Sequence, residues 1–160
     1  MLVMNKILSW NIRGLGNPLA KRILKDMLLQ NKIDLVRIQE TKLEIYPYRC
    51  FSTLSSHITS WHHKPSVGSA GGILVGVNDN LFDVLSVWVK EFSVSVLLKN
   101  KVDSFEWIFS VVYGPTVSHL RGSFLDEIRE ISQLGPEAVL ICGDFNLIRS
   151  EKVGKIFNMY

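Results

Sequence analysis

Three apolar runs of the sequence end in polar side chains, four in all, that can bind a hard cation or a phosphate. They are Asn11, Glu40, Asp144 and Asn146. In layered α/β folds, sites form where the carboxyl ends of strands open into loops. Asp144 and Asn146 are two residues apart, so their side chains point to the same side of an extended segment. Two carboxylates and two amides converging there would suit Mg²⁺, which prefers oxygen ligands and could polarise a phosphoryl oxygen.

Each of these positions also has a purely structural interpretation, because polar residues commonly cap the turns at strand ends. Tyr113 ends an aromatic stripe and is by default a core or rim tyrosine. The pair Gly71-Gly72 is most simply a turn or bulge. The adjacent His62 and His63 would point to opposite faces of a strand, and no other histidine completes a ligand set. The sequence contains no nucleophile elbow, P-loop or dinucleotide fingerprint.

The first 40 residues predict a strand, a helix and a second strand. An apolar run at 7–10 is followed by Asn17-Pro18, which supply an N-cap and a proline at the first helical position. Apolar pairs then recur every four residues, which is helical spacing, and 34–38 reads as the second strand. This order indicates a βαβ unit within a layered α/β domain.

The middle of the chain alternates apolar and polar residues over several runs, which predicts an antiparallel meander through residues 73–113. A helix with Ser118 as its cap is expected to share one apolar face from Leu120 to Ile131 and to stop at Gly135-Pro136. A short buried strand is expected at 138–142, and 147–160 carry no clear element. The expected fold class is therefore α/β (α+β), a layered sandwich.

Composition places the chain among ordinary globular proteins. It has 160 residues, 18 Lys+Arg against 15 Asp+Glu, and its basic residues are scattered rather than clustered. Cys50 and Cys142 cannot form a disulfide framework, and Cys142 is expected to pack as a small hydrophobe. No apolar run is long enough to span a bilayer, so no membrane association is expected. Arg37 lies within a predicted strand, where an unpaired buried guanidinium would cost several kcal/mol.

Four motifs occur in order across residues 10–146: Trp10-Asn11-Ile12-Arg13-Gly14-Leu15, Gln39-Glu40-Thr41, Val112-Tyr113-Gly114-Pro115 and Gly143-Asp144-Phe145-Asn146. Together they resemble the endonuclease/exonuclease/phosphatase superfamily, which shares the deoxyribonuclease I-like fold. Within it, the sequence is most similar to the apurinic-endonuclease-like domain of non-LTR (LINE-type) retrotransposon proteins. The resemblance implies Mg²⁺-dependent hydrolysis of phosphodiesters in DNA, with Mn²⁺ as an alternative metal, and action in the nucleus.

The resemblance also implies a role for each matching residue. Asn11 and Glu40 would help hold the divalent metal. Tyr113 would contact the scissile phosphate. Asp144 would orient or activate the attacking water, and Asn146 would support the phosphate and the transition state.

The sequence departs from the family pattern after Asn146. Family members carry a further metal-site aspartate and a closing Asp-His pair there, whereas the 14 residues after Asn146 contain neither aspartate nor histidine. We therefore expect 1–160 to be a partial, truncated domain that lacks the carboxyl-terminal sheet and has impaired activity, since losing a general acid/base typically costs about 10²–10⁴-fold in rate. The alternatives are a non-catalytic remnant of a retrotransposon endonuclease domain, which would expose sheet edges and be prone to aggregation, and a phosphatase or deadenylase of the same superfamily.

Overall fold

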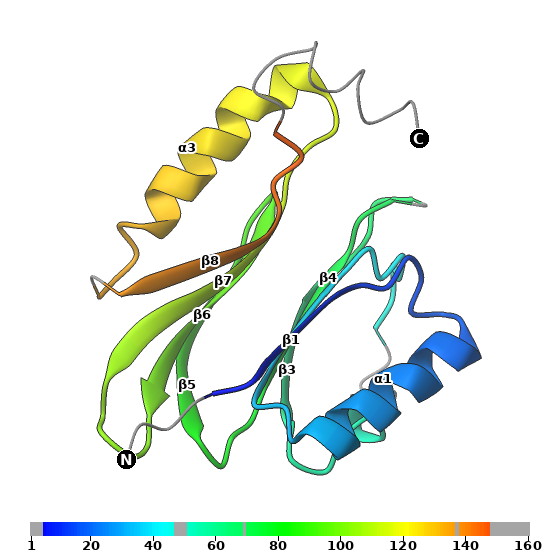
Figure 1. Cartoon of the computed structure of the whole chain (residues 1–160). Helices are drawn as coiled ribbons and strands as arrows, with labels where there is room; N and C mark the ends of the chain where they lie inside the picture. The colour runs from blue at the N-terminus through cyan, green and yellow to red at the C-terminus, as the bar shows by residue number, and fades with distance from the viewer. Residues whose placement is uncertain (1–4, 47–50, 69, 137, 148–160) are drawn as a thin grey trace.

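A computed structural model describes residues 5–46, 51–68, 70–136 and 138–147, and the account below concerns these residues. They form two four-stranded mixed sheets that pack face to face, with helix α1 outside one sheet and α3 outside the other (Figure 1). The first sheet has the order β1 (Ile7–Asn11), β2 (Leu35–Gln39), β4 (Ile73–Val77), β3 (Ser60–Lys64). The second has the order β5 (Phe82–Val89), β6 (Ser93–Asn100), β7 (Glu106–Tyr113), β8 (Val139–Asp144). The expected layered α/β sandwich is confirmed.

The predicted βαβ unit is present at the start of the chain. α1 (Pro18–Asn31) connects β1 to β2, and these two strands pair in parallel. Asn17 is the N-cap, because its side-chain oxygen accepts a hydrogen bond from the Leu19 amide at 2.9 Å. Leu24 and Leu28 are fully buried, whereas Leu19 and Ile23 are exposed. Ala20 and Met27 are partly buried against the same cluster, so the helix packs through Ala20, Leu24, Met27 and Leu28.

The predicted meander is correct for three strands and wrong for the fourth. β5, β6 and β7 pair in order as antiparallel neighbours. β4 instead lies in the first sheet, between β2 and β3, and β3 was not predicted. All five β4 residues are buried, which explains its place, because a continuous apolar run suits a central strand that is covered on both faces.

A register shift interrupts β5 between Val84 and Ser86. Leu85 lies at this shift, yet the alternation expected through Leu85, Val87 and Val89 is kept, because all three are exposed and the residues between them are half-buried.

α3 (Arg121–Ile131) begins differently from the prediction. Ser118 starts a short 3₁₀ turn, η1 (Ser118–Leu120), and its carbonyl accepts the Arg121 amide, while the N-cap Leu120 has no side-chain capping bond. The expected Ser118 cap is therefore wrong. Phe124 and Ile131 are fully buried and pack with apolar residues of β7.

The space between the sheets contains apolar side chains and a polar link at β2. The Gln39 side-chain amide donates to the Val112 carbonyl and so joins the two sheets. Arg37 is half-buried and donates from Nη2 to Gln39 Oε1 at 2.7 Å, so part of its guanidinium is satisfied.

Cys142 packs against this core as expected, and burial raises the pKa of its thiol. Cys50 lies outside the described residues.

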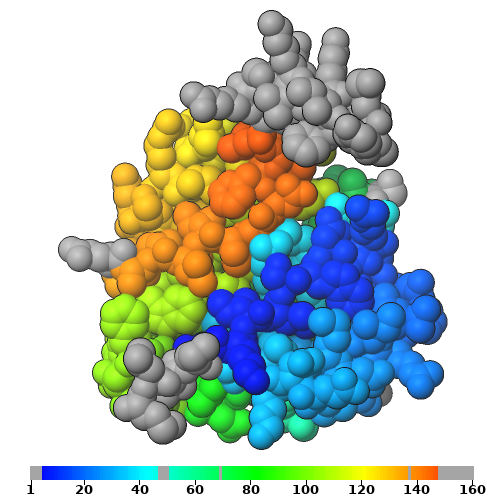
Figure 2. All heavy atoms as spheres, viewed as in Figure 1, coloured from blue at the N-terminus to red at the C-terminus, as the bar shows by residue number. Residues whose placement is uncertain are grey.

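β1 and β8 lie at the margins of their sheets, each pairing with one strand, and both are visible on one face of the molecule (Figure 2). Within the described segments, neither α1 nor α3 has the length and apolar character needed to cross a membrane.

Candidate active site

The four strands that carry the sequence motifs end at the same edge of the sandwich. β1 and β2 are parallel, with Asn11 opposite Gln39, and β7 and β8 are parallel, with Tyr113 opposite Asp144. The two sheets are in contact at these ends, where the Tyr113 hydroxyl donates a hydrogen bond to Glu40 Oε1 at 3.3 Å. Residues far apart in the sequence thus converge as the strand-end argument predicted.

Asn11 and Glu40 form the tightest pair at this edge. Asn11 Nδ2 donates to Glu40 Oε1 at 2.7 Å. Because an ionised carboxylate only accepts hydrogen bonds, the amide nitrogen must face Glu40. The other amide atom, Asn11 Oδ1, is buried and has no hydrogen-bond partner among the residues that the structure describes. An orphaned carbonyl oxygen beside a carboxylate is an uncommon arrangement that leaves two kinds of oxygen donor available to one ligand.

The backbone around Glu40 is fixed from two sides. Glu40 itself has a left-handed φ of 52°, and its carbonyl accepts the Gly14 amide at 2.9 Å. On the other side, the Thr41 and Lys42 amides donate to the carbonyls of Gly72 and Gly71 at 3.3 and 3.1 Å. The loop that presents the carboxylate is therefore held between the segments before α1 and before β4.

Gly72 allows this close packing. A Cβ atom there would lie 2.1 Å from Thr41 Oγ1, and its φ is +88°. Thr41 is fully buried, and its hydroxyl is hydrogen-bonded to that of Tyr46. Burial raises the pKa of Tyr46 to about 12, against a smaller lowering by the Thr41 hydrogen bond. These contacts give the Gly71-Gly72 pair a role in supporting the Glu40 loop.

Asp144 and Asn146 form a compact turn after β8. The Asn146 amide donates to Asp144 Oδ1 at 3.0 Å, and Asn146 Nδ2 donates to the Gly114 carbonyl at 2.7 Å. The Gly114 amide in turn donates to the Asp144 carbonyl at 2.7 Å. A Cβ at Gly114 would lie 2.0 Å from the Phe145 carbonyl oxygen, so only glycine fits. The loops after β7 and β8 are thus locked together.

The two carboxylates create a negative potential that reaches Tyr113. Burial is the largest cause of the raised pKa of the Tyr113 hydroxyl, and the charge and hydrogen bond of Glu40 and the charge of Asp144 add to it. Tyr113 is therefore a neutral donor at physiological pH. Its hydroxyl is hydrogen-bonded to Glu40, while Asp144 on the neighbouring strand β8 acts on it through its charge.

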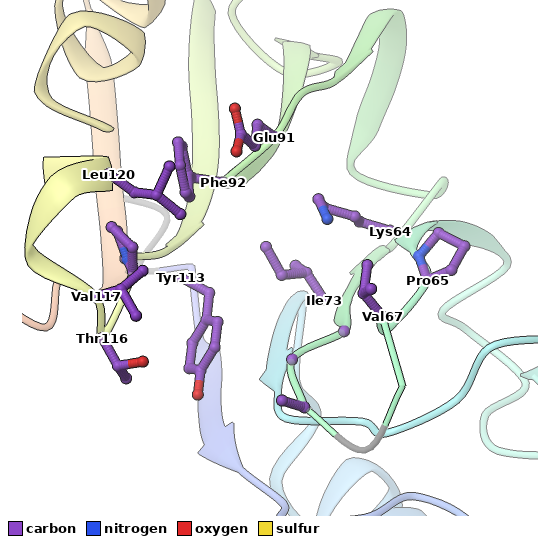
Figure 3. Close-up of a pocket in the computed structure, with 15 residues that line it drawn as sticks. Lys64, Pro65, Val67, Ile73, Glu91, Phe92, Tyr113, Thr116, Val117 and Leu120 are labelled. Atoms are coloured by element: carbon purple, nitrogen blue, oxygen red, sulfur yellow. The ribbon is translucent and has the colours of Figure 1, made fainter. Parts of the chain in front are cut away.

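An open cavity of about 290 Å³ adjoins the site on the side of the Tyr113 ring (Figure 3). Phe92, Val117 and Leu120 border it from the second sheet and its connections, and Lys64 and Ile73 border it from the first. The cavity can accept an apolar or flat group of a ligand that is bound by the Tyr113 hydroxyl.

The donor set at this edge fits a hard divalent cation. In the part of the chain that the structure describes, no three His, Cys, Asp or Glu side chains gather as a metal cage. Mg²⁺ does not need one, because it is usually bound by one or two carboxylates and retains several waters. Asn11 Oδ1 and the Glu40 carboxylate supply such oxygens, and the orphaned state of Asn11 Oδ1 is the observation that favours a ligand there.

The structure brings Asn11, Glu40 and Tyr113 into one hydrogen-bonded group, places Asp144 opposite Tyr113 at the end of β8, and places Asn146 in the turn that follows. Sequence reasoning did not single out two further residues near them. Tyr46 has no motif that marks its contact with Thr41. Arg121 follows the β7 motif by a few residues and borders the Asp144 turn, a position that only the folded chain reveals.

The sequence profile of the endonuclease/exonuclease/phosphatase family matches residues 8–159, nearly the whole chain. The chain belongs to this family. The family comprises metal-dependent phosphodiesterases and phosphatases, and its members generally require a divalent metal. No curated protein matches the chain by sequence.

Solved structures of the family share this fold. The catalytic domain of human Nocturnin with bound sulfate superposes with a TM-score of 0.66 at 15% identity, over 97% of this chain and 68% of that one. Truncated Caenorhabditis elegans TDP2 gives 0.63 at 20% identity, over 89% and 62%. ANGEL2, a 2′,3′-cyclic phosphatase in complex with adenosine-2′,3′-vanadate, gives 0.67 at 17% identity, over 94% and 56%. The chain thus spans about 56–68% of the length of these three family members.

Proposed function

We propose that this chain carries the metal-binding and phosphate-contacting half of a Mg²⁺-dependent DNA phosphodiesterase, most similar to a retroelement endonuclease. The observation that carries the proposal is the Asn11–Glu40–Tyr113 hydrogen-bonded group with its orphaned amide oxygen, beside Asp144. The residues of the first and third sequence motifs, Trp10–Leu15 and Val112–Pro115, support similarity to the retroelement endonucleases. Manganese would serve as an alternative metal, because its oxygen-ligand preference is similar.

Each residue has a defined task in this proposal. Asn11 Oδ1 and Glu40 would hold the cation, whose chemistry would be to polarise a phosphoryl oxygen and offset charge on the leaving oxygen. Tyr113, neutral because its pKa is raised, donates its hydroxyl proton in a hydrogen bond to the scissile phosphate. Asp144 accepts a hydrogen bond from the attacking water and orients it. Asn146, already fixed to the Gly114 carbonyl, positions the Asp144 side chain through its backbone amide and supports the phosphate.

There are two alternatives to this proposal. A phosphatase or deadenylase activity is favoured by the similarity to ANGEL2, a 2′,3′-cyclic phosphatase. A non-catalytic remnant of a retrotransposon endonuclease domain is the second alternative. We also propose that the substrate is DNA and that the protein acts in the nucleus, as the resemblance implies.

Plasmid nicking tests the proposal. We expect slow, Mg²⁺- or Mn²⁺-dependent conversion of supercoiled plasmid to the open circle, lost on chelation with EDTA. Glu40→Gln and Asp144→Asn should each abolish it, because both remove charge without changing side-chain volume. Asp126→Asn is the matched control, since Asp126 is an exposed carboxylate paired with Arg129 on α3.

Equal background nicking by the wild type, Glu40→Gln and Asp144→Asn would reject catalysis by this chain and favour the remnant. Hydrolysis of a 2′,3′-cyclic mononucleotide without plasmid nicking would favour the phosphatase alternative.

A further inference from the structure

Arg121 lies at the start of α3, close to the Asp144 turn. It borders an open hollow of about 420 Å³ whose other lining residues include Thr116, Asp144 and Asn146. Asn11 and Glu40 do not border this hollow. Arg121 therefore shares a hollow with Asp144 but not with the pair suited to a metal.

The guanidinium of Arg121 has no partner among the described residues. Its Nε is buried and makes no hydrogen bond, and no ion pair joins it to Asp144. Arg129, on the same helix, is instead paired with Asp126 and largely exposed. A buried donor without an acceptor costs free energy comparable to a lost hydrogen bond, so its retention here needs an explanation.

A phosphate supplies the acceptor that Arg121 lacks. The guanidinium presents a planar fork of donors that matches two oxygens of one phosphate, and such charge-assisted bonds are about twice as strong as neutral ones. Among the residues that line the hollow, Arg121 is the single cation, facing an edge that carries Glu40 and Asp144. A polyanionic substrate approaching these carboxylates needs positive charge close by.

We propose that Arg121, assisted by the Thr116 hydroxyl, binds the phosphate next to the scissile one in a nucleic-acid strand. This inference rests on the proposed function, because it takes the scissile phosphate to lie between Tyr113 and Asp144. The separation of the hollow from Glu40 is what assigns Arg121 to a neighbouring phosphate. Arg121 is in this sense a substrate-binding residue that determines preference for strands over mononucleotides.

Binding without catalysis tests this inference independently of nicking. Affinity for a short DNA duplex is measured by fluorescence anisotropy in EDTA at several KCl concentrations, for the wild type, Arg121→Gln, Arg121→Lys and the matched control Arg129→Gln. We expect Arg121→Gln to bind about tenfold more weakly at low salt and to reduce the slope of log K against log[KCl] by about 0.9, the value for one phosphate contact on duplex DNA. Arg129→Gln should match the wild type.

Arg121→Lys keeps the charge and the alkyl stem, so its slope should stay near that of the wild type while its affinity falls several-fold, roughly as expected when a bidentate contact becomes a single one. Thermal unfolding of each variant shows that it is folded, and if Arg121→Gln is not, the affinity of Arg121→Lys decides. The proposal is wrong if Arg121→Gln coincides with Arg129→Gln, if Arg121→Lys binds as the wild type does, or if the wild type does not bind the duplex. A difference in binding together with failed nicking would retain the phosphate site and reject only the catalytic proposal.

Discussion

At the scale of a single residue, the pKa of Tyr113 depends on the charge of the candidate site. Its hydroxyl contacts Glu40, and its pKa is raised by burial, by Glu40 and by Asp144. The contribution of the carboxylates can be separated from that of burial, because a neutral amide at residue 40 preserves the packing and removes the charge.

We predict that Glu40→Gln lowers the pKa of Tyr113 relative to the wild type. The ionised tyrosinate is disfavoured by the nearby negative charge, so removing that charge makes ionisation easier and moves it to lower pH. Ultraviolet difference titration measures the shift, and Tyr113→Phe identifies the transition among the four tyrosines of the chain. An unchanged titration in Glu40→Gln would show that Glu40 does not contribute to the raised pKa of Tyr113.

Single residues were predictable from the sequence where they directly follow a strand. Asn11, Glu40 and Asp144 were selected because apolar runs ended beside them, and the parallel pairs β1–β2 and β7–β8 then brought them to one edge. Tyr46 and Arg121 could not be selected in this way. Their importance depends on contacts between loops, which local periodicity does not encode.

At the scale of elements, the loop that presents Glu40 depends on its contact with the segment before β4. Gly72 has a left-handed φ, and a Cβ atom at this residue would lie only 2.1 Å from Thr41 Oγ1. A side chain at residue 72 must therefore displace buried Thr41 or open the hydrogen bonds between the two segments.

We predict that Gly72→Ala destabilises the fold by more than the roughly 1–3 kcal/mol typical of backbone strain alone, because a steric clash adds to the strain. Gly68→Ala is the matched control, since Gly68 also has a positive φ but a Cβ atom there would meet no described atom within 4 Å beyond its chain neighbours. Urea unfolding of both variants provides the comparison. Equal losses of unfolding free energy would show that the Thr41 contact yields without cost.

Strand pairing shows where sequence reasoning about elements stops. The βαβ unit and the β5–β7 hairpins join neighbours in the chain, and both were predicted. β4 pairs with β2, which is separated from it by more than 30 residues, and no local signal specifies that partner. β3 contains Trp61, His62 and His63 between polar residues and lacks the apolar alternation that marks a strand.

At the scale of the whole molecule, the sandwich leaves apolar side chains at one open side. In the described segments β1 pairs only with β2, and β8 only with β7. Ile7 lies opposite Leu35 and Leu140 opposite Phe109, and both of these partners belong to the core between the sheets. Ile7 and Leu140 thus face the same interior but are 39% and 41% exposed.

Open strands with exposed apolar neighbours favour pairing with another copy of the chain. We therefore predict concentration-dependent self-association of the isolated chain, and a shift towards monomer in Leu140→Lys, because a charge on this edge opposes burial in a shared sheet. Sedimentation velocity at increasing protein concentrations measures both. Leu19→Lys is the control, since Leu19 is 62% exposed on the outer helix α1 rather than at this edge. If Leu19→Lys reduces association as much as Leu140→Lys does, general surface hydrophobicity rather than the β8 edge drives it.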